Sequence, residues 1–179
     1  MGNWKTAYNW MMDNEDPQRS CTEVPSVCPG GVNGPCYSIS GIKSCVWPAE
    51  FEAIAALPQG EREPLVQQFY ENHFSNSWYA QLASDEVCKR VFDFAANCGS
   101  STAVRCLQQA LNSLTGPDGA QLVDDGDWSA MTLDAANAAD PLALVAAFKV
   151  QRADYYRSLV AANPGMANYL GTWIARAEK

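Results

Sequence analysis

Runs of apolar residues at helical spacing, each closed by a proline or a glycine, make up most of this chain. The last run places five apolar residues on one helix face: Met166, Tyr169, Leu170, Trp173 and Ile174. Earlier runs predict helices over residues 4–15, 48–57, 64–74, 84–98, 100–114, 131–138 and 141–162. With almost no strand signal and no internal repeat, the pattern predicts an all-α fold in which the last stripe packs in the core.

Residues 16–35 break this pattern and predict a long irregular loop, because they are rich in proline and glycine. Residues 37–42 then alternate polar and apolar side chains, which predicts a short strand or an extended turn. Four of the seven cysteines fall in or beside this stretch: Cys21, Cys28, Cys36 and Cys45. They form no C-x-x-C pair and the single histidine, His73, is remote, so disulfides are favoured over a zinc site and no metal is expected.

Length and charge exclude several functions. The chain has 179 residues, a formal net charge of −8 and a pI near 4.5, which argues against a nucleic-acid partner. It contains no run of about 18 apolar residues, so no membrane span is expected. The N-terminus has neither a basic region nor an apolar stretch, so no signal peptide is visible and export would use another route or a separate leader.

Glu15 is the candidate catalytic residue. It shares a helix face with Trp4, Tyr8 and Met11, and the following Asp16-Pro17 predicts that the helix ends there. A carboxyl at a helix end, against aromatic rings and facing a loop, is expected to have a raised pKa, as a general acid needs near neutral pH. The alternative is a surface glutamate beyond a frayed helix end.

Two other polar features have a structural interpretation that outweighs a catalytic one. His73 sits beside the apolar face of its helix and is favoured as a structural histidine. Asp93 and Asn97 lie one turn apart on a mostly apolar helix, which favours a buried, hydrogen-bonded brace over a catalytic pair.

Several segments match, in order, the motifs of one enzyme family. Asn14-Glu15-Asp16 stands where that family has a catalytic Glu-Gly-Gly, and Tyr37-Ser38-Ile39-Ser40 stands where it has Tyr-Gly-Ile-Ser/Thr. The glycines of both motifs are replaced here. The segment from Phe69 to Phe74 with Trp78-Tyr79 is similar to the family's tyrosine-tryptophan helix, and residues 92–99 resemble its Phe-Asp-x-x-x-Asn-x-Gly helix.

The second half continues the match with Leu107-Gln108-Gln109-Ala110-Leu111-Asn112, then Asp125-Gly126 and Thr132-Leu133, and finally Gly171-Thr172-Trp173-Ile174-Ala175-Arg176. In this order the motifs resemble the glycoside hydrolase family 108 lysozymes, which are N-acetylmuramidases of the secretion-activator and phage-endolysin type. The resemblance implies a lysozyme-like helical half over residues 1–82. It also implies a helical peptidoglycan-binding half over residues 83–179, with the two halves packed as one globule.

The resemblance further implies hydrolysis of the β-1,4 bond between N-acetylmuramic acid and N-acetylglucosamine, with Glu15 as general acid. The implied substrate-binding residues are Tyr37, Ser38, Ser40, Trp78, Tyr79 and Asn97. Trp47 is a further aromatic candidate, although each aromatic side chain is individually more typical of a core. The second catalytic group stays open between Asp16, Glu23, Asp93 and a water held by Ser38 or Ser40.

These inferences predict a monomer that needs no cofactor. It is expected to act on peptidoglycan glycan strands at the cell wall, in the periplasm or outside the cell. A different class of function remains open. The same fold would also suit a non-catalytic cell-wall-binding or secretion-accessory protein, and the replaced glycines beside Glu15 and Ser38 favour it. A generic helical interaction domain is the third alternative.

Overall fold

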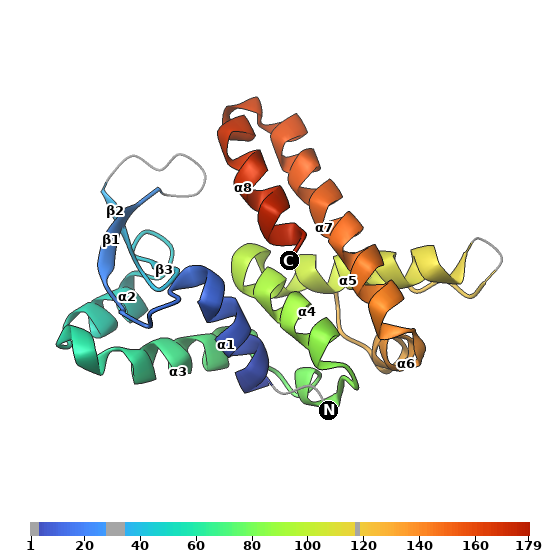
Figure 1. Ribbon diagram of the computed structural model, residues 1–179, viewed down its shortest axis with the longest axis horizontal. Helices are drawn as coiled ribbons and strands as arrows, with labels where there is room; N and C mark the ends of the chain where they lie inside the picture. Colours follow the sequence, from blue (N-terminus) through green and yellow to red (C-terminus); the bar gives the residue numbers. More distant parts are fainter. Residues whose placement is uncertain (1–3, 28–34, 117–118) are drawn as a thin grey trace. The chain divides into compact units, whose positions relative to one another are not determined.

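The computed structural model describes residues 4–27, 35–116 and 119–179 (Figure 1). The chain divides into two compact units. The N-terminal unit is Tyr8–Ser75, and the C-terminal unit comprises Met1–Ala7 and Asn76–Lys179. Among the described residues there are eight α helices and one small three-stranded sheet, which confirms the all-α prediction with short strands only. The sequence-based division at residue 82 stays a prediction.

Among the helices of the described residues, none has the length and apolarity that a membrane span requires.

The N-terminal unit is built from three helices and the sheet. Helix α1 covers Trp4–Glu15 and ends where the Asp-Pro signal predicts, and α2 (Pro48–Ala55) and α3 (Glu63–Phe74) both begin with a proline in the first turn. The buried side chains of this unit form its core: Tyr8, Met11, Met12, Ile39, Ile42, Ile54, Val66, Phe69 and Tyr70. This core brings the end of α1 against α3 and the sheet.

The sheet has the antiparallel order β1-β2-β3, with β1 at Glu23–Ser26, β2 at Cys36–Ile39 and β3 at Ile42–Lys43. The short strand or extended turn predicted at residues 37–42 corresponds to the end of β2, a turn at Ser40-Gly41 and the start of β3. The prediction of an irregular segment throughout residues 16–35 is wrong at β1, because pairing with β2 supplies hydrogen bonds that no local pattern announces. Pro25 is tolerated because β1 is an edge strand.

One of the expected disulfides is present. It joins Cys36 on β2 to Cys45, just after β3. Cys21 belongs to the cysteines for which the sequence favours disulfides, but it is a buried free thiol. Cys88 and Cys106 are also buried free thiols, which pack as small apolar side chains. Cys28 lies outside the described residues.

The C-terminal unit contains α4 (Asp85–Cys98), α5 (Ser100–Thr115), α6 (Ala130–Ala138), α7 (Pro141–Ala162) and α8 (Ala167–Ala177). Ser84, Ser129 and Asp140 cap three of these helices with side-chain oxygens, and Gly99, at φ +91°, ends α4. Helix α5 packs against α4 and α7, and α7 packs in turn against α8.

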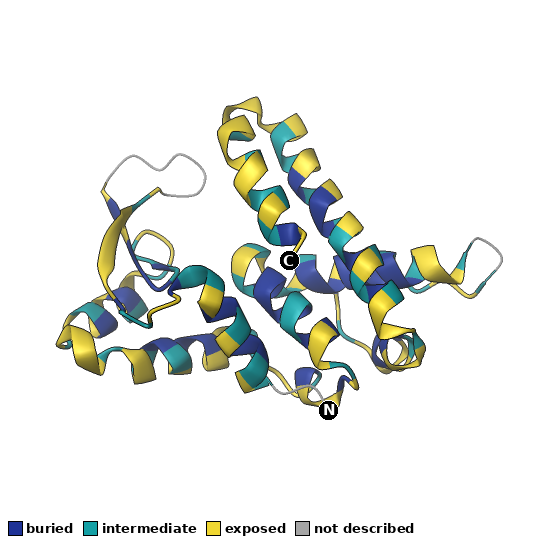
Figure 2. Ribbon diagram, viewed as in Figure 1, coloured by how far each residue is buried: buried dark blue, intermediate teal, exposed yellow. Residues whose placement is uncertain are grey.

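Helix α8 does not follow the prediction of a core stripe. Only Ala177 is buried, and Tyr169 is 44% exposed, so α8 is mostly yellow in Figure 2. Within this unit α8 packs mainly against one neighbour, α7, which is too little surface to bury the whole stripe. Trp173 instead stacks between Tyr156 and Tyr169, with ring centroids 5.4 and 5.7 Å away.

A buried ion cluster joins three helices of the C-terminal unit. Asp93 on α4 is fully buried, and its carboxylate accepts hydrogen bonds from Arg152 on α7 at 2.6 Å and from Arg176 on α8 at 2.7 Å. One turn further along α4, Asn97 accepts a 2.8 Å hydrogen bond from the Tyr156 hydroxyl. The predicted buried, hydrogen-bonded brace is confirmed for Asp93, whereas Asn97 is exposed and bonds separately to Tyr156.

The family-like motif residues of the second half have a structural role in this fold. The buried Gln108 donates to Asp125 and to the Asp127 carbonyl, and accepts a 2.9 Å hydrogen bond from the Gly126 amide. Asn112 pairs through both ends of its amide with the Leu122 backbone. The motif therefore fixes the connection from α5 to α6 because it satisfies that connection's backbone groups.

Candidate functional site

The candidate site lies at the last residue of α1. Glu15 is partly exposed there, and its Oε2 lies 2.9 Å from the point where a Cβ on Gly41 would stand. The Tyr70 hydroxyl lies 2.6 Å from the same point, so the two oxygens are close neighbours over the Gly41 backbone. Any side chain at Gly41 would displace them, and its φ of +87° independently favours glycine.

Tyr70 fixes the backbone beside Glu15. Its hydroxyl donates a 2.8 Å hydrogen bond to the carbonyl of Ser40, immediately before Gly41. The ring lies 5.8 Å from that of Tyr8, so both tyrosines line the core under the end of α1. An aromatic side chain, Tyr70, therefore lies near the Glu15 carboxylate.

Asp16 holds the loop around Glu15 in place. Its carboxylate accepts from the Cys21 amide at 2.7 Å, from the Ser20 amide at 3.0 Å, and from the hydroxyls of Ser40 and Ser20 at 2.8 and 3.1 Å. Burial, the largest single influence, raises the pKa of Asp16, but these hydrogen bonds together outweigh it and lower the pKa below its ordinary value. Asp16 is thus an ionised acceptor whose bonding capacity is used within the protein.

The backbone near this carboxylate is strained at three residues. Arg19, Cys21 and Ser40 have φ of +50°, +48° and +48°, a region that residues other than glycine seldom adopt. Two of the three, Cys21 and Ser40, donate directly to Asp16. Such strain persists where surrounding bonds enforce it, and it concentrates at functional sites.

The other predicted residues of the N-terminal unit have separate environments. Ser40 belongs to the site just described. Tyr37 on β2 is 39% exposed, whereas Ser38, also on β2, is buried at 9% exposure. Trp47 packs on His73 and Phe69, with ring centroids 4.4 and 5.2 Å away.

His73 is structural, as the sequence favours. Its Nε2 lies 3.2 Å from the Glu50 carboxylate, and its ring packs 4.6 Å from that of Phe69. The histidine therefore ties α3 to α2.

Three predicted substrate-binding residues belong to the C-terminal unit. Trp78 is half-buried and stacks on Trp128 with ring centroids 6.1 Å apart. Tyr79 is fully buried between Phe92 and Trp128, so in this structure it is a core residue that a sugar does not reach. Asn97 is exposed, but its amide oxygen already accepts from Tyr156.

Sequence reasoning missed Gly41 and the roles of Tyr70 and Asp16. A glycine inside the predicted short strand was the available signal for a close backbone approach. Tyr70 appeared only as part of an apolar helix face, and Asp16 only as a possible second carboxylate. Within the described ranges, no group of three or more histidine, cysteine, aspartate or glutamate side chains is arranged to hold a metal ion.

Asp16→Asn is expected to destabilise the protein in a pH-dependent way. The pKa of Asp16 is lowered in the folded protein. The carboxylate therefore contributes fully to the stability of the fold above the ordinary pKa of 3.8, and this contribution disappears as pH falls through the lower folded pKa. The gap between the denaturation midpoints of wild type and variant should therefore be widest near neutral pH and should narrow below about pH 4. Urea unfolding across this range measures it, with the exposed Asp134→Asn as control. A gap that does not change with pH would contradict the role of Asp16.

Comparison with known proteins gives a family match and eight matching chains of solved structures. Residues 102–178 match a family described as "Predicted Peptidoglycan domain", a range within the C-terminal unit. The fold is similar to a structure titled "Structure of Brucella abortus SagA", with a TM-score of 0.59 and 17% identity over 97% of this chain and 92% of that one. No curated protein matches the sequence. The structural likeness shows a shared fold, and the family match supports a protein related to the cell wall.

Proposed function

We propose that the protein is a peptidoglycan hydrolase of the N-acetylmuramidase type, with Glu15 as its general acid. One observation carries the proposal: the Glu15 carboxylate, at the end of α1, lies beside the Tyr70 hydroxyl and the Ser40-Gly41 backbone. Hydrogen bonds from Ser40 to Asp16 and from Tyr70 to Ser40 fix this backbone in place. The match of residues 102–178 to a peptidoglycan domain supports the substrate class.

In this mechanism protonated Glu15 gives its proton to the glycosidic oxygen while positive charge develops on the sugar ring. Gly41 matters because it leaves the carboxylate room at the surface. Tyr70 and Asp16 act as positioning residues, since they fix Ser40 and Gly41 without offering a free proton.

Two of the candidates for the second catalytic group are already engaged in bonds within the protein. Asp16 accepts four hydrogen bonds within the protein, and Asp93 is fully buried in its ion cluster. Glu23 is exposed on β1, where its backbone pairs with Ile39, one residue before Ser40, and its side chain makes no hydrogen bond or ion pair within the described residues. We propose Glu23 as the second carboxylate, with a water held by Ser40 as the alternative.

The products of digestion test this proposal. Purified wild-type protein is expected to clear a peptidoglycan suspension and to leave reducing N-acetylmuramic acid ends, which borohydride reduction and chromatography identify. Reducing N-acetylglucosamine ends would instead indicate a glucosaminidase, and anhydro-muramic ends a lytic transglycosylase. Either result would reject the muramidase assignment.

A non-catalytic wall-binding protein is the second candidate. It is favoured by one observation, the replacement of the expected Glu-Gly-Gly by Glu15-Asp16-Pro17. This candidate predicts that the protein sediments with cell-wall sacculi but releases no soluble fragments from them.

A further inference from the structure

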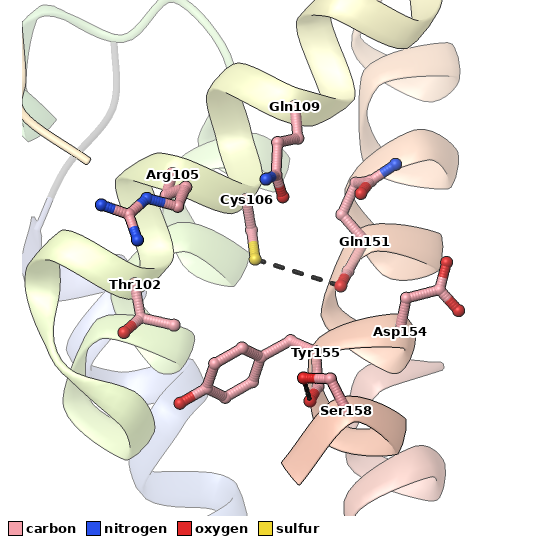
Figure 3. A pocket seen from close by; sticks show the side chains of 8 residues that line it. All are labelled: Thr102, Arg105, Cys106, Gln109, Gln151, Asp154, Tyr155 and Ser158. Atoms are coloured by element: carbon pink, nitrogen blue, oxygen red, sulfur yellow. Dashed lines mark hydrogen bonds between the residues drawn. The ribbon is translucent and has the colours of Figure 1, made fainter. Parts of the chain in front are cut away.

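A pocket opens between α5 and α7, wholly within the C-terminal unit (Figure 3). Its volume is about 290 Å³, close to the lower end of the range for small-molecule sites. Figure 3 shows Thr102, Arg105 and Gln109 on α5 and Gln151, Asp154 and Tyr155 on α7 along its two sides. All of them lie within the segment that matches the peptidoglycan domain.

The inner wall of the pocket is uncharged and includes an aromatic ring. Cys106 is buried, and burial raises the pKa of its thiol to about 12, so the thiol remains neutral. Tyr155 is half-buried, and its ring is held edge-on by Phe94 at 5.5 Å between centroids. Burial also raises the pKa of the Tyr155 hydroxyl, which stays protonated beside Thr102.

The rim of the pocket supplies both hydrogen-bond donors and hydrogen-bond acceptors. The Nε and Nη2 atoms of Arg105 donate hydrogen bonds to the backbone carbonyls of Asp124 and Asp125, which fixes the guanidinium. Its Nη1 makes no hydrogen bond within the described part of the chain. The Gln151 side-chain amide likewise makes none there. Among the described residues, the Asp154 side chain pairs only with Arg157, in a surface ion pair whose side chains are both more than half exposed. The rim therefore carries one cation, one anion and a neutral amide.

We propose that this pocket binds one N-acetylated amino sugar of a glycan strand, as a subsite separate from Glu15. A pyranose offers an apolar face for the Tyr155 ring, and its hydroxyl and acetamide groups suit the amide of Gln151, the carboxylate of Asp154 and the guanidinium of Arg105. The opposite charges at the rim cancel, and the net charge of −8 disfavours an anionic ligand. This inference rests on the proposed role at peptidoglycan but not on catalysis.

The double variant Gln151→Ala/Asp154→Asn tests the subsite. In a Glu15→Gln background, which prevents cleavage, it is expected to weaken binding to purified sacculi and to N-acetylglucosamine trimer by about tenfold, the usual effect of losing two polar contacts. Arg157→Gln is the matched control, since it removes the same surface pair without altering the pocket lining. Sedimentation and calorimetry give the affinities, and thermal unfolding confirms the fold.

A second pair of variants tests the pocket by filling it. Ser158→Trp, at the pocket wall, should also reduce binding, whereas Ala146→Trp at an exposed position of the same helix should not. The inference is overturned if both pocket variants bind as the control does, or if the Glu15→Gln protein binds neither probe. It is also overturned if the loss appears only with sacculi that retain stem peptides and not with peptide-free glycan.

These outcomes separate the two proposals. If the wild type releases no fragments but its binding depends on the pocket, the catalytic assignment fails and the subsite stands. If the wild type cleaves sacculi and the pocket variants bind normally, the subsite alone fails.

Discussion

Replacing Glu15 with glutamine is expected to slow peptidoglycan cleavage by roughly a hundredfold to ten-thousandfold, the contribution typical of a general acid. Glutamine keeps the shape of the side chain but has no proton to give to the leaving oxygen. Because Glu15 is partly exposed at a helix end, the change should leave the thermal unfolding temperature nearly unaltered. The initial rate of release of soluble fragments from purified peptidoglycan measures the effect.

The control for this experiment is Glu71→Gln, the same substitution at an exposed position of α3 directly after Tyr70. It should retain the wild-type rate. Full activity in Glu15→Gln would remove Glu15 from the mechanism, provided that the fragments come from this protein and not from a contaminant. Glu15→Ala is the check on that point, since it also lacks the acid, and fragments released at the wild-type rate from its preparation as well would indicate a contaminant.

Asp93→Ala is expected to lower the free energy of unfolding by about 3–5 kcal/mol, which makes it the most destabilising single change considered. The variant would leave the guanidinium of Arg152, which is only 1% exposed, buried without its carboxylate partner. It would also free Arg176 from α4, so the connection of α8 to the rest of the unit should weaken. Urea denaturation followed by circular dichroism measures the loss.

Glu86→Ala on the same helix is the matched control. Its carboxylate also pairs with two cations, Lys89 and Arg90, but its side chain is 51% exposed, so the loss should be about 1 kcal/mol or less. Equal losses in the two variants would show that burial of the Asp93 cluster does not strengthen it.

Local signals in the sequence determined the helices. The Asp-Pro pair after Glu15, the caps at Ser84 and Asp140 and the glycine at residue 99 act within one helical turn of the ends they define, so the structure has these ends where the sequence predicts them. The same local reasoning placed Glu15 at the end of α1 and Asp93 on a buried face.

Only the tertiary structure decided which side chains meet. Tyr37 and Tyr79 are equivalent candidates in the sequence, yet one is exposed and the other fully buried, because burial depends on what packs against each. Gly41 and Tyr70 meet Glu15 from segments more than 20 residues away, Asp16 reaches Ser40 across a similar separation, and β1 exists only through its pairing with β2. Periodicity fixes one face of a helix, whereas the number of neighbours that cover this face is a property of the whole fold. For that reason the sequence of α8 determined an apolar stripe, and the packing against α7 decided that most of it stays at the surface.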